Sequence, residues 1–342
     1  MCSIRAYVAT EQAFSLDFCR AWGEPVGRAD FRTIAEDFVV VEVVGELLDA
    51  PRANDGGHVY LQIRKRHQNT RWVAALLAQR FDVGERDVGY CGLKDRRALT
   101  TQWFSLPLSA GAPELYPGSL SLPDCEVLQV TRGPRKLRRG THSSNIFSIR
   151  LRNFSGDVSA AEQRLITIAN EGVPNYFGEQ RFGIGGANLR AADAILTQTS
   201  MRRGRRHSGT DSKRGLYISA ARAYLFNCVL SARVANGTWA TPLDDEEVAR
   251  GPLWGRGRSV VGERLAALER QVLTPHGAWQ GGLEHCGLQQ ERRDLVLIPR
   301  EFRWQWQHRD LQLDFALPPG TFATTVLREL AITNAPAHRA VL

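Results

Sequence analysis

Alternation of apolar and polar residues predicts that the first half of the chain is rich in strands. Residues 38–48 form an apolar, β-branched run, and residues 58–66 alternate in the way that is typical of a strand with one buried face. Near the other end of the chain, residues 302–306 and 310–317 predict two strands. Further strand patterns lie at residues 88–91, 100–107, 126–131 and 144–154.

Helical periodicity interrupts these strands. Thr70 is the predicted N-cap of a helix over residues 70–81, in which apolar residues recur at the spacing of one helix face. Asp157, with Glu162 in the following turn, predicts a second helix through Ile168. Because strands and helices follow without a regular βαβ rhythm, the pattern favours the α+β class. Further helices are predicted at residues 188–198 and 218–235, and at residues 321–330, where Thr321 is the expected cap.

The composition of the chain changes after Gly172. Residues 174–188 (PNYFGEQRFGIGGAN) are rich in glycine and aromatic residues, and residues 251–282 are rich in Gly, Arg and Trp and have weak periodicity. Strand patterns return only in the last part of the chain. This order predicts a domain that is inserted into a second, strand-rich domain.

Length and composition predict a globular protein of two domains. The chain has 342 residues, of which 43% are hydrophobic and 23% charged. Its six cysteines include no Cys-x-x-Cys pair, which argues against a zinc ribbon, a redox motif and a disulfide framework. No run approaches 18 apolar residues, and the N-terminus has no signal-peptide pattern. We therefore expect a cytoplasmic protein without a membrane partner, and a monomer is the simplest expectation.

The charge of the chain is compatible with nucleic acid as a partner. The formal net charge is +8 and the sequence pI is about 9.5. Only four basic residues are lysines, and arginine suits phosphate and bases, although a GC-rich genome would give the same bias.

Two basic clusters carry much of this charge. Residues 127–156 contain no acidic residue, and a second cluster lies in a Gly/Ser-rich loop. Two clusters that are well separated in sequence predict an extended track for RNA phosphates, and the alternative is a pair of solvated basic loops. The predicted RNA-backbone residues of the first cluster are Arg132, Arg135, Lys136, Arg138 and Arg139, and the second consists of Arg202, Arg203, Arg205, Arg206, Lys213 and Arg214.

Asp95 is the candidate reactive group. It follows the predicted strand at residues 88–91 and lies between Lys94 and Arg96. Nearby cations keep a carboxylate ionised, and an ionised Asp without a second acid suits a nucleophile better than a general acid. The alternative is a charged turn with surface ion pairs.

Motifs for other chemistries are missing from the sequence. The run Gly183-Ile184-Gly185-Gly186 has no preceding apolar strand and lacks the third glycine of a dinucleotide loop. There is no Walker A loop, no Gly-x-Ser-x-Gly elbow and no zinc-deaminase signature. We therefore expect chemistry that uses no metal and no small-molecule cofactor.

Six segments together resemble the TruD family of tRNA pseudouridine synthases. They occur in the order of the family, span nearly the whole chain, and include the Lys-Asp-Arg motif around Asp95. Each segment alone is a weak signal, whereas six in register make a chance match improbable. The segments are AEDFVVVE (35–42), GLKDRRALTTQWF (92–104), NIFSIRLR (145–152), GVPNYFGEQRFGIGGANL (172–189), LYISAARAYLFN (216–227) and LPPGTFATTVLREL (317–330).

The resemblance implies a fold, a domain division and a reaction. The fold is a pseudouridine synthase catalytic fold of the α+β class with a central mixed or antiparallel sheet, interrupted by an inserted α/β TRUD domain. The catalytic domain would comprise residues 1–171 and 298–342, and the insertion residues 172–297. The reaction would be the isomerisation of uridine-13 in the D-arm of tRNA to pseudouridine, without a cofactor.

The resemblance also implies roles for single residues. Asp95 matches the catalytic aspartate, and Phe147 would stack where most other pseudouridine synthases have a Tyr. Either Lys94 or Arg96 would keep Asp95 charged, and the sequence leaves this choice open. Positions that contact the target uridine are matched by Phe38, Asn145 and Phe322.

Two other functions are compatible with parts of the pattern. A non-catalytic RNA-binding protein would need only the basic clusters and the aromatic residues, but it gains nothing from an aspartate that faces phosphates. An S-adenosylmethionine-dependent RNA methyltransferase is disfavoured because no glycine-rich loop follows a strand.

Overall fold

The computed structural model of the chain describes residues 14–45, 57–107, 115–118, 120–201 and 211–334. Contacts divide the chain into two compact units. The sheet unit comprises residues 22–173 and 297–342, and the helical unit comprises residues 1–21 and 174–296. The division predicted from the sequence assigned the N-terminal residues to the first of these units. The structure instead places residues 14–21 with the inserted segment, because Phe14 and Phe18 pack against its aromatic core.

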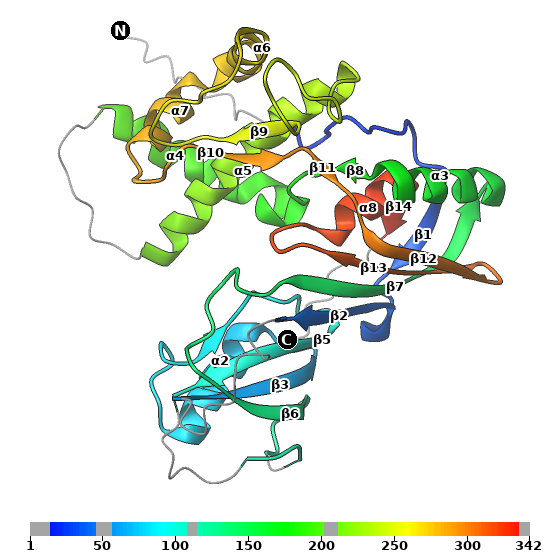
Figure 1. The fold of residues 1–342 in the computed structure, drawn as a ribbon, viewed down its shortest axis with the longest axis vertical. Helices are drawn as coiled ribbons and strands as arrows, with labels where there is room; N and C mark the ends of the chain where they lie inside the picture. The colour runs from blue at the N-terminus through cyan, green and yellow to red at the C-terminus, as the bar shows by residue number, and fades with distance from the viewer. Residues whose placement is uncertain (1–13, 46–56, 108–114, 119, 202–210, 335–342) are drawn as a thin grey trace, which may run out of the picture. The chain divides into compact units, whose positions relative to one another are not determined.

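A mixed sheet of ten strands forms the frame of the sheet unit within the described residues (Figure 1). Its main order is β12-β13-β7-β2-β5-β3-β6, with β1 beside β7 and β14, and β4 beside β5. Most neighbours are antiparallel, whereas β2 with β5 and β1 with β14 are parallel. The strands are β1 (Gly27–Phe31), β2 (Phe38–Val43), β3 (His58–Arg66), β4 (Gly89–Tyr90), β5 (Leu99–Leu106), β6 (Cys125–Gly133), β7 (Ser144–Gly156), β12 (Arg300–Gln307), β13 (Asp310–Leu317) and β14 (Ala331–Asn334).

The predicted strands are confirmed, and the structure adds β1 and β14. These two strands escaped the pattern because each has only four or five residues and is completed by a partner far away in sequence. The α+β class and the large mixed sheet are therefore present in the structure.

Helices cover the sheet at two places and define two cores. The helix α2 (Thr70–Phe81) packs on β3 and β5 through Val73 and Leu77. The helices α3 (Val158–Glu171) and α8 (Ala323–Leu330) pack on the β7 and β13 end of the sheet, as Figure 1 shows. Truncation of one fully buried leucine in such a core costs about 2–5 kcal/mol. The short helix η1 (Ala35–Asp37) leads into β2.

Two of the predicted helix caps are wrong. The N-cap of α2 is Asn69, whose side chain accepts from Trp72 N at 2.7 Å, so the hydroxyl of Thr70 is available for another bond. The N-cap position of α8 is Phe322, while the hydroxyl of Thr321 donates to the Pro318 carbonyl.

The predicted cap of α3 is confirmed. Asp157 accepts from the backbone N–H groups of Ser159 and Ala160 at 2.8 and 3.1 Å. Glu162 has a different role, because its carboxylate accepts from the indole N–H groups of Trp304 and Trp306.

The helical unit surrounds an aromatic and aliphatic core built from α4 (Ala187–Met201) and α5 (Asp211–Ala235). Both helices were predicted. The weakly periodic region 251–282 contains α6 (Glu263–Leu273) and α7 (Gly277–Glu284), which the sequence did not reveal. A two-stranded sheet joins β9 (Arg250–Leu253) to β10 (Glu291–Asp294). The chain passes between the units at β8 (Val173–Pro174) and β11 (Val296–Leu297), and three short helices are η2 (Glu179–Arg181), η3 (Ile184–Gly186) and η4 (Thr274–His276).

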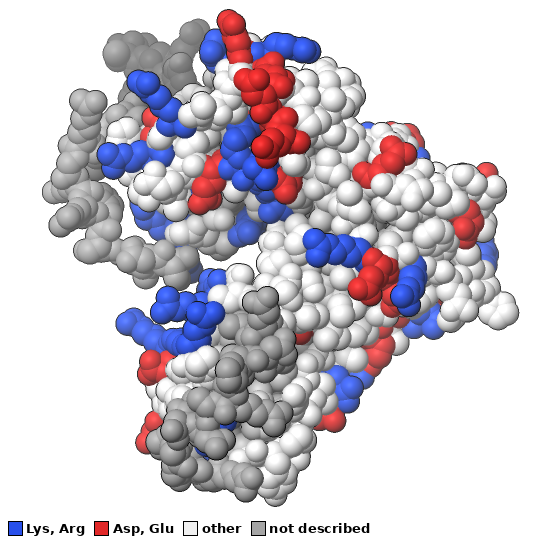
Figure 2. All heavy atoms as spheres, in the orientation of Figure 1, with Lys and Arg blue, Asp and Glu red and all other residues white. Residues whose placement is uncertain are grey.

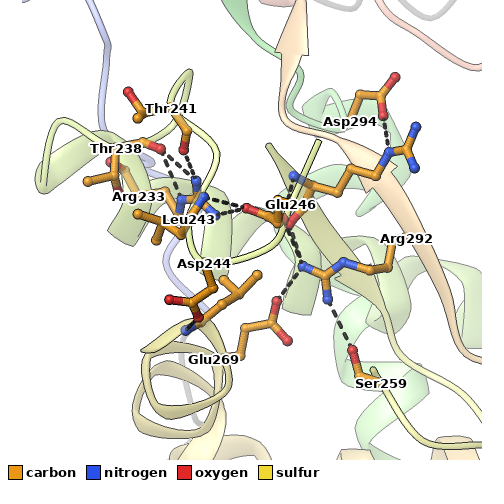
Figure 3. A network of polar contacts seen from close by, with 12 residues as sticks. Arg233, Thr238, Thr241, Leu243, Asp244, Glu246, Ser259, Glu269, Arg292 and Asp294 are labelled. Atoms are coloured by element: carbon orange, nitrogen blue, oxygen red, sulfur yellow. Dashed lines mark hydrogen bonds and ion pairs between the residues drawn. The ribbon is translucent and has the colours of Figure 1, made fainter. Parts of the chain in front are cut away.

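A buried ion-pair network fixes β10 within the helical unit (Figure 3). Arg233 is fully buried, donates to the Thr238 carbonyl and lies 3.1 Å from Glu246. Arg292 of β10 lies 3.5 Å from Glu246 and 2.7 Å from Glu269. The network thus neutralises two arginines with two carboxylates. No helix in the described part of the chain is long and apolar enough to cross a membrane.

Candidate active site

Asp95 lies in the loop between β4 and β5 and is held from two sides. Its Oδ2 lies 2.7 Å from Arg32 Nη1, and its Oδ1 accepts from the backbone N–H of Arg97 at 2.9 Å. The side chain nevertheless remains 35% exposed. The structure therefore presents an oriented carboxylate that a ligand can still approach.

Arg32 is the cation at this carboxylate, and the sequence did not indicate it. It follows β1 with a left-handed φ of 60°, and its guanidinium lies over the ring of Phe38 at 4.2 Å and over that of Phe31 at 4.7 Å. Burial lowers the pKa of Arg32 and the neighbouring Asp95 raises it, and an arginine side chain stays charged at neutral pH. No local motif could have found this pair, because 63 residues separate its members.

Lys94 and Arg96 have other partners than Asp95. Lys94 Nζ lies 2.8 Å from Glu42 Oε2, and these side chains are 6% and 0% exposed. Arg96 Nε donates to the His67 carbonyl at 2.9 Å. Among the residues that the structure describes, the ion pair of Asp95 is made with Arg32 and with neither of its two neighbours in sequence.

Lys94 also connects Glu42 to Asn145. Glu42 and Asn145 face each other on the paired strands β2 and β7. Lys94 Nζ donates to Asn145 Oδ1 at 2.5 Å, and Asn145 Nδ2 lies 3.1 Å from His142 Nε2. Burial, followed by Lys94, lowers the pKa of His142, which favours the neutral ring. Because Lys94 occupies its oxygen, the Asn145 amide is fixed with its N–H₂ group toward His142.

The backbone of the Asp95 loop is tied to the sheet. The hydroxyl of Thr70, which does not cap α2, accepts from Lys94 N at 3.0 Å and donates to Gln102 Oε1 at 2.8 Å. Gln102 Nε2 in turn donates to the Gly92 carbonyl at 3.3 Å. A loop carried by such buried bonds can hold a reactive side chain in one place.

The aromatic residues form a wall rather than exposed stacking platforms. Phe38 and Phe147 are 5% and 7% exposed, and their ring centroids lie 6.0 Å apart. Phe147 also stacks on Phe315 at 5.5 Å. Both rings belong to the core beneath Arg32, so most of their surface serves packing. Phe322 is half-buried at the N-terminus of α8.

The connection between β6 and β7 carries exposed basic residues. Figure 2 shows Lys and Arg side chains grouped over this part of the sheet unit. Arg135, Arg138 and Arg139 are exposed, and Leu137 anchors the segment in the core. A cavity of about 310 Å³ is lined by Arg135, Lys136, Leu137, Arg138 and Thr141. Arg132 is half-buried, and Lys136 donates to the Arg86 carbonyl.

Two arginines of the first basic cluster, residues 127–156, are neutralised by ion pairs within the protein. Arg152 pairs with Asp37, and Arg150 pairs with Asp310, both of which come from distant parts of the sequence. Of the second predicted cluster, Arg202, Arg203, Arg205 and Arg206 lie outside the described residues. Among the residues that the structure describes, no three His, Cys, Asp or Glu side chains are grouped so that they could hold a metal ion.

Comparison with known proteins supplies the family. The sequence model of tRNA pseudouridine synthase D (TruD) matches residues 20–201. The chain is 47% identical to the tRNA pseudouridine synthase D of Cellvibrio japonicus, with 94% of each chain covered, and 41% identical to that of Nitrosococcus oceani, with 91% and 92% covered. A crystal structure of the putative tRNA pseudouridine synthase D from Methanosarcina mazei matches with a TM-score of 0.65 at 19% identity, covering 91% of this chain and 95% of that one.

Proposed function

The chain belongs to the tRNA pseudouridine synthase D family and is an isomerase, and we propose that it converts uridine-13 in the D-arm of tRNA to pseudouridine with Asp95 as its nucleophile. One observation carries the assignment of the nucleophile. Asp95 is oriented by Arg32 and by a backbone N–H, and one third of its side chain is still exposed.

The reaction needs no redox change and no energy source. The N1–C1′ bond of uridine breaks, the base turns, C5 bonds to C1′, and the C5 proton is lost while N1 gains one. An ionised Asp95 can attack C1′ or C6, or it can take the C2′ proton on a glycal route. Arg32 Nη1 lies 2.7 Å from Asp95 Oδ2 and holds the carboxylate in one orientation for each of these routes.

The surroundings of Asp95 suit a uridine taken out of its stack. The wall of Phe38 and Phe147 offers an apolar edge beside Arg32, and Phe322 supplies a further half-buried ring. When the contact between Asn145 Nδ2 and His142 Nε2 is broken, the Asn145 amide can donate to a uracil edge or a ribose hydroxyl. We assign these four residues to substrate binding.

RNA phosphates are assigned to the β6–β7 connection. Its arginines are exposed, and the adjoining cavity is lined by basic side chains. The sheet unit, residues 22–173 and 297–342, is proposed as the pseudouridine synthase catalytic domain, and residues 174–296 as the inserted TRUD domain.

The test compares Asp95→Asn with the wild type on an unmodified tRNA transcript, with pseudouridine mapped by position. We expect no pseudouridine in the variant and an affinity for tRNA within a few-fold of the wild type. Asp87→Asn, which makes the same change at an exposed aspartate of the sheet unit, serves as the control and should retain full activity. Pseudouridine formation by Asp95→Asn would overturn the assignment of Asp95 as the nucleophile. Conversion of another uridine by the wild type, in place of uridine-13, would overturn the proposed substrate position.

A further inference from the structure

The turn between β3 and α2 holds the Asp95 loop on both sides of the aspartate. Before Asp95 in the chain, Lys94 N donates to the hydroxyl of Thr70 at 3.0 Å. After it, Arg96 Nε donates to the His67 carbonyl at 2.9 Å. Both acceptors belong to the same short turn, so one segment of the sheet unit fixes both chain neighbours of the candidate nucleophile.

This turn, residues 67–70, is itself held by buried and capping bonds. Lys65 is 1% exposed, and its ammonium donates to the Gln68 carbonyl at 2.6 Å. Gln68 Nε2 donates to Asp124 Oδ2 at 3.1 Å, and Asn69 caps α2. Removing an ammonium from water costs free energy unless it is hydrogen-bonded, and here the bond is made to the backbone of the turn. These bonds hold the turn in one conformation.

Thr70 connects the turn to the middle of the sheet. It is the first residue of α2 and is 1% exposed, and its hydroxyl donates at 2.8 Å to Oε1 of Gln102, which is fully buried. The core around it is otherwise apolar and includes Ile63 and Val73. A valine would fill the same space, so packing does not require the hydroxyl. The hydroxyl instead gives Lys94 N a fixed place, because a fully bonded polar network specifies one arrangement.

The position of the loop decides the position of the carboxylate. Asp95 Oδ1 accepts at 2.9 Å from Arg97 N, which belongs to the same loop, whereas Oδ2 meets Arg32, which follows β1. A displaced loop would therefore carry Asp95 away from Arg32. Reacting groups that are misplaced by about 1 Å can lose about a hundredfold in rate.

We propose that Thr70 is a positioning residue for Asp95, and that the contact between Arg96 and the His67 carbonyl is a second anchor on the other side of the carboxylate. Thr70 acts through Lys94 N and does not touch the substrate, since it is buried. In this arrangement the role of Arg96 is to hold the loop. The inference rests on the proposed function of Asp95 as the nucleophile.

The main experiment measures kcat for pseudouridine formation and the affinity for tRNA separately. Thr70→Val removes the hydroxyl and keeps the shape of the side chain, whereas Thr70→Ser keeps the hydroxyl. The control is Thr100→Val. Thr100 is fully buried on β5, and its hydroxyl has no hydrogen-bond partner in the described part of the chain. All enzymes are assayed at a temperature at which circular dichroism shows them to be folded.

We expect Thr70→Val to lower kcat by about ten- to a hundredfold, with an affinity for tRNA within a few-fold of the wild type. Thr70→Ser should recover most of the rate, and Thr100→Val should match the wild type. A purely structural role would lower the melting temperature of Thr70→Val and leave the kcat of the folded enzyme unchanged. That result, or a Thr70→Ser enzyme as slow as Thr70→Val, would overturn the proposal.

Hydrogen exchange at the Lys94 amide tests the first anchor without turnover. The bond to Thr70 protects this amide, so it should exchange faster in Thr70→Val than in the wild type or in Thr100→Val. Equal exchange in the three proteins would overturn the anchor even if the rate of Thr70→Val falls. If the wild type forms no pseudouridine, the proposed function fails while the exchange rates still test the anchor, so the two failures are distinguishable.

Arg96→Met tests the second anchor and does not disturb the core, because Arg96 is exposed. It removes the donor to the His67 carbonyl and should lower kcat at saturating tRNA. This variant keeps the proposal testable if Thr70→Val does not fold. An unchanged kcat in Arg96→Met would overturn the two-sided anchoring of the loop.

Discussion

Replacing Lys94 with Met removes the cation of the most buried ion pair next to the Asp95 loop. Lys94 Nζ lies 2.8 Å from Glu42 Oε2, and exposure of these side chains is 6% and 0%. The substitution leaves the carboxylate without its counter-charge and takes the donor from Asn145 Oδ1. Removing one partner of a buried pair costs about 3–5 kcal/mol, and we expect the free energy of unfolding to fall by that amount.

A second substitution shows whether the isolated charge causes this loss. Glu42→Gln removes the negative charge but keeps an oxygen for Trp103 N, which donates to Glu42 Oε1 at 3.1 Å. The double variant has no isolated charge, so we expect it to recover about 2 kcal/mol of the loss caused by Lys94→Met. This coupling is the quantity that the buried geometry predicts.

The assay is urea unfolding followed by tryptophan fluorescence, for which the chain has eight tryptophans. The control is Arg64→Met, which breaks an exposed ion pair. The side chains of Arg64 and its partner Glu126 are 45% and 59% exposed. An exposed pair contributes less than about 1 kcal/mol. If Lys94→Met costs no more than this control, or if the double variant is less stable than Lys94→Met, the reasoning from burial is refuted.

Three further predictions follow from the same contacts. Arg32→Gln should lower kcat with little change in tRNA affinity, because it removes the ion pair that orients Asp95. Arg32→Lys should restore part of the rate. Equal rates for the wild type and both variants would contradict this role of Arg32. The pKa of His142 is lowered in the folded state, so the unfolded chain binds more protons just below pH 6.5 and stability rises with pH in that window. His142→Gln should flatten this rise in stability, measured by urea unfolding just below pH 6.5. An unchanged profile would exclude His142 as its source. Charge-removing substitutions in the β6–β7 connection, at Arg135, Arg138 and Arg139, should reduce the dependence of tRNA affinity on salt concentration. An unchanged dependence would mean that these arginines do not contact the RNA.

Sequence alone was sufficient where the determining interactions are local. Alternation over β3 and β13 and the cap at Asp157 predicted elements that the structure contains, because strand faces and N-caps depend on residues a few positions apart. The order of six motifs also identified the family and directed attention to Asp95. The cap at Thr70 was predicted one residue too late, because Thr and Asn are both good caps and only the fold shows that Thr70 bonds to the Asp95 loop.

What only the tertiary structure decided is which charges meet. By sequence, Lys94 and Arg96 are the neighbours of Asp95, yet Lys94 is bound to Glu42 and the carboxylate is held by Arg32. Similarly, Arg292 and Arg293 are adjacent in the chain, yet Arg292 meets the Glu269 carboxylate at 2.7 Å and Arg293 donates to Asn175 Oδ1 at 2.6 Å. The physical reason is that a strand turns successive side chains to opposite faces, while sheet pairing brings segments that are distant in sequence to about 4.8 Å from each other, where their side chains can meet. The sequence therefore determined most of the elements, the family and the candidate nucleophile, and the fold determined which side chains hold and orient that candidate.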